Sequence, residues 1–435
     1  MVKKQDTIYA LSTPPGKSAI AVIRISGKKA FDHIKKMSSS MPTKPNTSTL
    51  NKLITQTGEV IDQTITTYYK APKSFTGENM VEISTHGGNA VINKLIDVFK
   101  KNKRMRLADP GEFTRRSFEN NKLDLTQVEA IADLINAETE YQRKQAYSQL
   151  EGNLTIKTKE IYNELTNVLA NTEATIDFVD EELPKDLLNN TKEQIENISN
   201  KINNIIKNNN KGRKIREGFV VGIIGNTNTG KSSFINNISN QEIAIVSNKP
   251  GTTRDAIESY IDIRGLPVRF FDTAGIRKHK NIVEKIGIKK SKTISKEADL
   301  NLIFINKTPE INDFKGTSNP IFVQSKYDIR NKPIKSIDIM NISSKTNFGI
   351  NNLLKAVFHK LSENNLTENT YISRERHIRC LIETRKYLEK SKEKKNYDVF
   401  AEDIRLATKE ISKIYGKIDI ENILDIIFSD FCIGK

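Results

Sequence analysis

The sequence predicts a multidomain α/β protein with three parts: an α+β N-terminal domain, an all-α helical domain in two pieces, and a doubly wound α/β domain inserted between those pieces. Three observations lead to this fold class. Strand-like runs and turn signals mix with short helical patterns in residues 1–118. Helical periodicity, nearly free of proline, fills 119–217 and returns in 362–435. Between them, 218–361 alternates short apolar runs with helical stretches, the βαβ pattern of a parallel sheet.

Length and charge are consistent with several folded domains. At 435 residues the chain exceeds one ordinary hydrophobic core. Its 69 Lys and Arg against 53 Asp and Glu give a formal charge of +16. This charge favours attraction to phosphate backbones, but it equally fits a composition rich in Lys and Asn.

Cysteine usage and hydropathy indicate the cellular compartment in which the protein is expected. Cys380 and Cys432, the only cysteines, lie far apart and show no metal-ligand spacing. That usage is typical of a reducing cytosol. No apolar run approaches the roughly 20 residues that span a bilayer, and the N-terminus lacks the apolar segment of a signal peptide. We therefore expect a cytoplasmic protein without membrane insertion.

The elements of the first two parts follow in chain order. "SAIAVIRISG" (18–27) and "NMVEISTHGG" (79–88) predict strands. Apolar residues at helical spacing in 128–135 begin the helical part, and "LTIKTKEIYNELTNVLANTEATIDFV" (154–179) continues it. A helix end and basic linker, "NNIIKNNNKGRKIREG" (203–218), then leads into the inserted domain.

The inserted domain contains four apolar runs that predict buried strands, at 219–225, 268–275, 300–306 and 319–328. Long charged amphipathic helices follow it, at 374–395 and 401–416. Because helical segments flank the α/β domain on both sides, we expect one helical domain interrupted by an insertion.

A phosphate-binding loop stands between the first of these strands and a helix. "GNTNTGKS" (225–232) matches GxxxxGK[ST] in the required strand–loop–helix context. Its glycines let backbone N–H groups face phosphate oxygens, and the helix N-terminus adds positive potential. Lys231 supplies a charge for the β- and γ-phosphates, and Ser232 a hydroxyl ligand for Mg²⁺. The nucleotide-binding residues predicted here are Asn228, Thr229, Gly230, Lys231, Ser232 and Ser233.

Four further motifs follow in the order found in GTPases: "GTTRD" (251–255), "DTAG" (272–275), "SKYD" (325–328) and "SSK" (343–345). Thr253 suits a second Mg²⁺ ligand, and Asp272 can hold the metal through water. Asp328 can accept hydrogen bonds from guanine N1–H and N2–H₂, which adenine lacks, so GTP is favoured over ATP. The predicted GTP site gains Gly251, Thr253, Asp272, Thr273, Ala274, Gly275, Ser325, Lys326, Asp328, Ser343, Ser344 and Lys345.

Two positions depart from the usual GTPase pattern. Ser325 stands where the guanine motif Asn-Lys-x-Asp has asparagine, and the shorter serine cannot contact both the base and the P-loop. We expect selective but weak guanine binding, with a loss on the order of 1 kcal/mol. Ile276 stands where Ras-like GTPases have the glutamine that orients the attacking water. Its side chain forms no hydrogen bond, so another group must take that role.

Segments outside the nucleotide site narrow the family. "ALSTPPGKSAIAVIRISG" (10–27), "SFTGENMVEISTHGG" (74–88), "RLADPGEFTRRSFENNKLDLTQVEAIADLI" (106–135) and "FCIGK" (431–435) resemble the MnmE (TrmE) family of tRNA-modification GTPases. The resemblance covers essentially the whole chain in order. It implies an N-terminal domain that binds tetrahydrofolate and dimerises, a discontinuous helical domain, and an inserted Ras-like P-loop GTPase domain.

The same resemblance implies an activity. With a flavin-bearing partner, MnmG (GidA), in a heterotetramer, the family installs a carboxymethylaminomethyl or aminomethyl group on C5 of the wobble uridine of certain tRNAs. The one-carbon unit comes from a folate, 5-formyl- or 5,10-methylene-tetrahydrofolate, and GTP hydrolysis is needed.

The resemblance also explains Ile276. Family members have a hydrophobic residue there, bind K⁺ beside the phosphates, and dimerise their G domains across the nucleotide. Asn228 matches the side-chain ligand of that K⁺, and Glu284 matches the glutamate that orients water, so Glu284 and Lys231 are the predicted catalytic residues. The predicted K⁺ ligands are Asn228, Ser247, Lys249 and Thr252, whose loop extends the GTP site by Ser247, Asn248, Lys249, Pro250 and Thr252.

By the same resemblance, Arg24, Glu82, Lys122 and Lys435 match folate contacts. A carboxylate such as Glu82 can pair with the aminopyrimidine edge of the pterin, while Arg24 and Lys122 can meet the acidic end or carbonyls. Taken singly, each of Arg24, Glu82 and Lys122 is more often an ordinary surface or ion-pair residue, and the matched flanking segments are what favour the folate role. Cys432 would lie near the one-carbon unit, either as a nucleophile or as a small buried residue.

Two other classes stay open from the residues alone. A ribosome-assembly GTPase would explain the P-loop and the positive charge, but it predicts a KH-like GxxG loop or an S1/OB module, for which we find no segment. A dynamin-like mechanical GTPase would suit the long helices, but no lipid-facing apolar stretch supports it.

Overall fold

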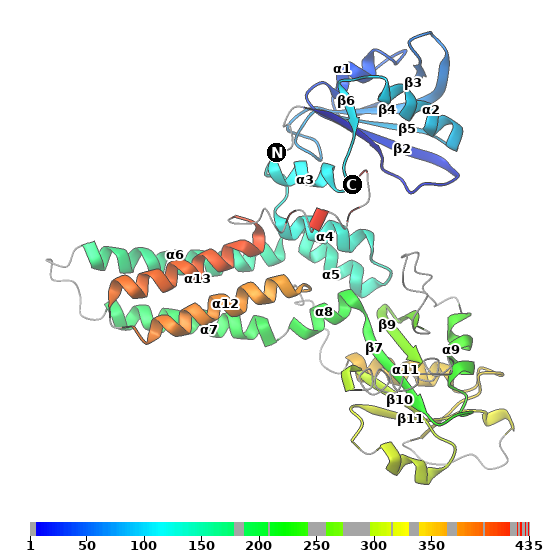
Figure 1. Cartoon of the computed structure of the whole chain (residues 1–435), viewed down its shortest axis with the longest axis vertical. Coiled ribbons are helices and arrows are strands. Elements are labelled where there is room, and N and C mark those ends of the chain that lie inside the picture. Colours follow the sequence, from blue (N-terminus) through cyan, green and yellow to red (C-terminus); the bar gives the residue numbers. More distant parts are fainter. Residues whose placement is uncertain are drawn as a thin grey trace, which may run out of the picture. The chain divides into compact units, whose positions relative to one another are not determined.

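The computed structural model describes residues 6–177, 187–207, 209–241, 258–272, 296–314, 316–329, 339–362, 372–394 and 396–417, together with Leu424, Ile427, Phe428, Phe431 and Gly434. The chain forms two compact units. The first comprises Met1–Ala132, Thr155–Tyr162 and Lys409–Lys435, and the second comprises Asp133–Leu154 and Asn163–Thr408. Their elements are labelled in Figure 1. Among the described residues, no helix combines the length and apolarity needed to cross a membrane.

The first unit contains a six-stranded sheet in the order β3-β4-β5-β2-β1-β6. Neighbouring strands are antiparallel except β1 and β6, which are parallel. The strands are β1 (Thr7–Leu11), β2 (Ser18–Ser26), β3 (Thr47–Ile54), β4 (Val60–Tyr69), β5 (Met80–Gly87) and β6 (Met105–Leu107).

Helices α1 (Ala30–Lys35) and α2 (Asn89–Lys100) both pack against β5. Apolar residues recur at helical spacing along α2, so one face of the helix is buried. Leu95 and Phe99 on that face join Ile34 of α1 in the core of the sheet. This core fixes the neighbouring strands β2 and β5, which carry the predicted folate residues Arg24 and Glu82.

Helical segments contribute to both units. In the first unit, Leu125 and Val128 of α4 pack with Phe428 and Phe431 near the end of the chain. In the second unit, α7 and α12 lie side by side. The helices are α3 (Glu112–Glu119), α4 (Leu125–Ile135), α5 (Glu140–Leu150), α6 (Asn153–Asp177), α7 (Leu187–Lys207), α8 (Asn209–Glu217), α12 (Glu375–Lys392) and α13 (Tyr397–Tyr415).

A second six-stranded sheet, in the order β12-β11-β10-β7-β9-β8, belongs to the second unit. All its pairs are parallel except the β8–β9 hairpin. The strands are β7 (Phe219–Gly225), β8 (Glu258–Ile263), β9 (Leu266–Asp272), β10 (Leu300–Phe304), β11 (Pro320–Gln324) and β12 (Ile339–Asn341). Helices α9 (Lys231–Ser239) and α11 (Ile350–Ser362) and the short 3₁₀ helices η2 (Thr308–Phe314) and η3 (Tyr327–Ile329) accompany them.

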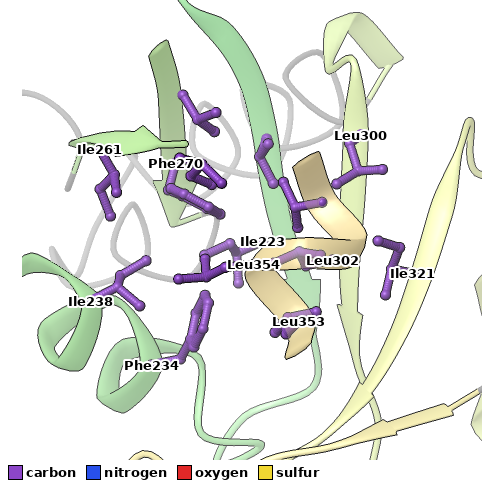
Figure 2. Close-up of a cluster of buried hydrophobic side chains, with 14 of the residues drawn as sticks. Ile223, Phe234, Ile238, Ile261, Phe270, Leu300, Leu302, Ile321, Leu353 and Leu354 are labelled. Carbon is purple, nitrogen blue, oxygen red and sulfur yellow. The ribbon is translucent and has the colours of Figure 1, made fainter. Parts of the chain in front are cut away.

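The core of this sheet is drawn in Figure 2. Ile223 of β7, Phe270 of β9 and Leu302 of β10 meet Phe234 of α9 and Leu353 of α11 in one buried cluster. Strands buried in this way read as near-continuous apolar runs, which is why the sequence indicates them clearly. The α+β, helical and doubly wound α/β parts of the predicted fold class are all present.

Candidate functional site: a nucleotide-binding loop and a half-buried ion pair

The predicted phosphate-binding loop joins β7 to α9. β7 ends at Gly225 and α9 begins at Lys231, so the loop meets the helix N-terminus. Gly225 and Gly230 have φ angles of 144° and 92°, which favour glycine. A Cβ on Gly225 would overlap the carbonyl oxygen of Phe304, and one on Gly230 would overlap the hydroxyl of Ser325. Both glycines are therefore needed for the shape of the loop and its close approach to neighbouring segments.

The ammonium of Lys231 is enclosed by this loop. The residue is buried, and its Nζ donates to the backbone oxygens of Gly225 at 2.8 Å and Asn226 at 2.6 Å. A phosphate oxygen is a stronger acceptor for an ammonium than a neutral carbonyl is. The side chain is thus positioned to exchange these bonds for contacts with nucleotide phosphates.

A hydroxyl and a carboxylate lie together beside the loop. Ser232 Oγ donates to Asp272 Oδ2 at 3.1 Å. Asp272 ends β9, the strand next to β7, and only 1% of it is exposed. Oxygen ligands of these two kinds are what Mg²⁺ uses beside substrate phosphates, so this donor pair fits Mg²⁺. Thr253, the predicted second ligand, lies outside the described residues.

The segment after β11 contacts the P-loop directly. Ser325 Oγ donates to the backbone oxygen of Thr229 at 2.5 Å, and Lys326 Nζ donates to that of Asn228 at 3.0 Å. Ser325 is buried, so its hydroxyl bond is shielded from water. The serine therefore keeps the P-loop half of the contact that an asparagine would make.

Asp328 is oriented by the loop after β12. Ser343 Oγ donates to Asp328 Oδ1 at 2.7 Å. The same loop is tied to α9, because Asn237 Nδ2 donates to the backbone oxygen of Ser344 at 2.9 Å and to Asn347 Oδ1 at 2.7 Å. The P-loop helix, the guanine-reading segment and the "SSK" loop thus form one connected set of hydrogen bonds.

Sequence reasoning missed an aromatic pair at this site. The rings of Tyr327 and Phe348 stack with centroids 4.4 Å apart and an interplanar angle of 9°. Both side chains are substantially exposed, at 37% and 50%. One aromatic inside "SKYD" and another just after "SSK" were the available signal. The stack links the two loops that orient Asp328 from the solvent side.

Three further predicted residues have exposed side chains. Ser233 and Lys345 are exposed, as is Asn228, whose φ of 61° is unusual for a residue other than glycine. The remaining predicted residues lie outside the described residues: Ser247, Asn248, Lys249, Pro250, Gly251, Thr252, Thr253, Thr273, Ala274, Gly275, Glu284 and Lys435. The same holds for Ile276 and Cys432.

In the first unit, Arg24 and Glu82 lie directly opposite each other on β2 and β5. They form an ion pair of 2.8 Å, with side chains 22% and 23% exposed. Tyr69 donates to Glu82 Oε2 at 3.3 Å, and burial followed by the charge of Glu82 raises the pKa of Tyr69. The Arg24 guanidinium lies over the ring of Phe75, 5.2 Å from its centroid. Two charges and two aromatic rings therefore share one half-buried place on the sheet.

Lys122 lies across the loop between β4 and β5. Its Nζ donates to the backbone oxygen of Pro72 at 3.1 Å. A Cβ on Gly77 would meet the side chains of Lys122 and Asn120, and Asn120 Nδ2 donates to the backbone oxygen of Thr76. Within the part of the chain that the structure describes, no hydrogen bond joins Lys122 to the other predicted folate residues.

A buried ion network accompanies this site and was also missed. Glu112, only 3% exposed, accepts hydrogen bonds from Arg106 at 2.7 Å and Arg116 at 2.9 Å, and Arg116 also pairs with Glu78 at 2.9 Å. Burial alone would raise the pKa of Glu112. Hydrogen bonds from Arg106, the backbone N–H of Asp109 and Arg116 outweigh that effect and leave the pKa below its usual value. Arg106, Glu112 and Arg116, in the segment 106–135 that resembles the family, therefore stabilise the fold.

A P-loop between β7 and α9, a carboxylate at the end of β9 and a guanine-type segment after β11 define the second unit's sheet as a P-loop GTPase domain. Two family descriptions match the chain one after the other: "GTP-binding protein TrmE N-terminus" over residues 7–122 and "MnmE helical domain" over 125–432. The chain belongs to the MnmE family of tRNA modification GTPases.

Relatives that align over their full length support membership in the MnmE family. The tRNA modification GTPases MnmE of Pelagibacter ubique and Aquifex aeolicus are 43% and 39% identical to this chain, over 99% of it and 100% of theirs. The resemblance stated from the sequence is confirmed. Among solved structures, the G domain of the T. maritima FeoB iron transporter matches with 21% identity and a TM-score of 0.25, covering 33% of this chain and 97% of that one.

Proposed function

We propose that this chain is a K⁺-stimulated GTP hydrolase that acts with a flavin-dependent protein of the MnmG (GidA) family. Together they would add a carboxymethylaminomethyl or aminomethyl group to C5 of the wobble uridine of certain tRNAs. One observation carries the proposal: a joined phosphate- and base-binding site in a chain that belongs to the MnmE family along its full length.

The described residues account for binding and orienting GTP. Lys231 would leave its loop carbonyls for the β- and γ-phosphates, and Ser232 and Asp272 would hold Mg²⁺. The ion would supply charge neutralisation between the two phosphates. Asp328, oriented by Ser343, would accept the guanine N–H groups and exclude adenine.

The potassium part of the proposal rests on Asn228. Its backbone oxygen already accepts from Lys326, whereas its side chain is exposed and has no hydrogen bond among the described residues. The side-chain oxygen is therefore available for a monovalent cation beside the phosphates. The proposed K⁺ set is completed by Ser247, Lys249 and Thr252. Such a cation stabilises developing charge in the way that an arginine finger does.

Water orientation is assigned to Glu284, because Ile276 provides no hydrogen bond. A carboxylate can accept a hydrogen bond from the attacking water and so align it with the γ-phosphate. Both positions lie outside the described residues, so their assignment is drawn from family membership and the sequence match.

A tetrahydrofolate derivative, 5-formyl- or 5,10-methylene-tetrahydrofolate, is proposed for the first unit. The residues present fit such a molecule: Glu82 offers a carboxylate to the aminopyrimidine edge, Arg24 and Lys122 offer cations, and Phe75 offers a ring beside them. Lys435 is the remaining proposed contact. When bound, the folate supplies the one-carbon unit of the modification.

The proposed assembly is a homodimer that joins the MnmG-type partner in a heterotetramer and receives tRNA in the cytoplasm. Within the chain we propose four segments: 1–118 as the folate-binding and dimerisation domain, 119–217 and 362–435 as the two parts of the helical domain, and 218–361 as the GTPase domain.

The decisive test is GTP hydrolysis by the purified chain in KCl and in NaCl at equal ionic strength and saturating nucleotide. We expect faster hydrolysis in K⁺, and Asn228→Ala should lose the difference between the two cations. Asn226→Ala, a change of the same kind in the same loop, is the matched control and should keep it. Glu284→Gln should slow hydrolysis with little change in GTP affinity.

Equal rates in K⁺ and Na⁺ would remove the cation from the mechanism. A near-normal rate in Glu284→Gln would likewise remove this glutamate as the water-orienting group.

A further inference from the structure

Eight basic side chains gather at the edge of the first unit where α1 and the turn after α2 meet. All eight are exposed. Four flank or belong to α1, and the other four end α2 or form the turn into β6. We call this group the α1–α2 basic cluster: Lys28, Lys29, Lys35, Lys36, Lys100, Lys101, Lys103 and Arg104.

The two halves of the cluster are held together by a specific contact. The side-chain nitrogen of Asn102, in the turn after α2, lies 3.1 Å from Nδ1 of His33 on α1. Burial and then the charges of Lys36, Arg104 and Lys29 lower the pKa of His33, against an opposing effect of Asp32. Cations from both halves therefore surround the same imidazole, so the cluster is one surface.

Several other cations of the same unit, unlike those of the cluster, pair with carboxylates. Lys94 pairs with Glu59, and Arg106 and Arg116 pair with Glu112. The eight clustered side chains form no ion pair or side-chain hydrogen bond within the described part of the chain. Asp32 and Asp97 are the exposed carboxylates on α1 and α2 themselves. The local charge is thus strongly positive, since these two carboxylates offset only part of the eight cations, and it favours an external polyanion.

We propose that the α1–α2 basic cluster binds the phosphate backbone of tRNA. This inference rests on the proposed function: we choose tRNA as the polyanion because a chain that takes part in tRNA modification encounters it. Lysine contacts of this kind position a nucleic acid without reading its sequence. The cluster would therefore give affinity and orientation, and would leave the choice of tRNA to other contacts.

The apolar residues interleaved with these lysines favour RNA over a lipid surface. Ile34, Phe99 and Met105 are turned into the core of the sheet, and Phe31 packs against the same core. A peripheral membrane anchor needs apolar side chains at the surface in addition to basic ones. The cluster presents charge without such an anchor.

The test measures binding of a fluorescent tRNA transcript to the full chain by anisotropy across a series of KCl concentrations. One variant carries Lys100→Gln, Lys101→Gln, Lys103→Gln and Arg104→Gln, and a second carries Lys28→Gln, Lys29→Gln, Lys35→Gln and Lys36→Gln. The control removes the same charge from four other exposed lysines, with Lys17→Gln, Lys52→Gln, Lys207→Gln and Lys355→Gln.

We expect each cluster variant to weaken tRNA binding about tenfold or more near 0.1 M salt. The slope of log K against log salt should become shallower by about one for each phosphate that the variant no longer neutralises. The control should stay within about twofold of the unmodified chain. Because all the substituted side chains are exposed, GTP hydrolysis should be unchanged in every variant.

Equal losses of affinity in the cluster and control variants would show that only bulk charge matters and would overturn the proposal. The same conclusion would follow if the cluster variants lost binding to vesicles of anionic lipid but kept their tRNA affinity. The assay requires neither hydrolysis nor folate. Its failure would therefore leave the proposed function standing, whereas loss of potassium-dependent hydrolysis would not affect the tRNA measurement.

Discussion

The Ser325 hydroxyl donates to the Thr229 carbonyl of the P-loop. Ser325→Asn should add the contact to the base that serine is too short to make. We expect guanine nucleotide binding to tighten by about fivefold, equivalent to roughly 1 kcal/mol. Titration of a fluorescent GDP analogue measures it directly.

Ser325→Ala is the matched control for that substitution. It removes the buried hydroxyl and leaves the Thr229 carbonyl without this donor, so binding should weaken. An unchanged or larger dissociation constant in Ser325→Asn would mean that the serine is not what limits guanine affinity.

Glu112 makes the stability of the first unit sensitive to acid. Its pKa in the folded chain is below the usual value, so its contribution is full at neutral pH and is lost as the pH falls below about 4–5. Glu112→Gln should lower the free energy of unfolding by about 3 kcal/mol at pH 7, because it leaves Arg106 and Arg116 without their buried partner. Denaturant unfolding at pH 7 and pH 4 measures both effects.

The penalty of Glu112→Gln should shrink at pH 4, because the glutamate of the unfolded chain is then partly protonated and part of the stabilisation from the lowered folded pKa is lost. Glu119→Gln is the control from the same helix, since Glu119 forms a partly exposed pair with Arg115 that contributes little. A Glu112→Gln penalty that stays equal at the two pH values would contradict the ionic explanation.

For single residues, the sequence predicted the site where neighbouring positions in the chain form it. The spacing of the P-loop placed Lys231 and Ser232 before any contact was known, because one turn and one helix start determine both. It was uninformative about Glu112, whose partner Arg116 also pairs with a residue in another loop, Glu78. When charged residues meet only after folding, no sequence pattern distinguishes them from charged residues at the surface.

Among the elements, the stack of Tyr327 on Phe348 joins the 3₁₀ helix after β11 to the loop after β12. Phe348→Ala should loosen the two loops that orient Asp328 and weaken guanine nucleotide binding by about three- to tenfold, given the ~0.5–1.5 kcal/mol of an aromatic pair. Calorimetric titration with GDP measures the change. Phe348→Tyr keeps a ring and should bind as the unmodified chain does; equal affinities in all three proteins would show that the stack does not support guanine binding.

Strand prediction succeeded where apolar residues run with few polar interruptions. The runs containing β7, β10 and β11 were predicted because apolar residues predominate in them, and β10 is buried along its whole length. β3 and β4 gave no such signal, since Leu50 and Ile65 are exposed and polar residues alternate with them. The order of strands within each sheet depends on side-chain packing between distant segments, so periodicity alone did not supply it.

For the whole molecule, composition predicted a helical region split by an inserted α/β domain, and the described helices lie on both sides of the second sheet along the chain. Composition could not predict that the first compact unit also takes in Thr155–Tyr162 and Lys409–Lys435. Those additions are decided by contacts between segments distant in the chain, such as the hydrogen bond from Ser12 Oγ to the backbone oxygen of Gly434 and the one between the hydroxyls of Thr126 and Thr155.

The packing of α4 against the far end of the chain has a consequence for biosynthesis. Leu125 and Val128 leave the ribosome long before their partners Phe428 and Phe431 are made. At about 5–20 residues per second, the delay is on the order of tens of seconds. During that time the nascent first unit exposes an apolar patch that the finished protein buries. The segment that holds Phe428 and Phe431, translated well after α4, therefore completes this part of the core of the first unit.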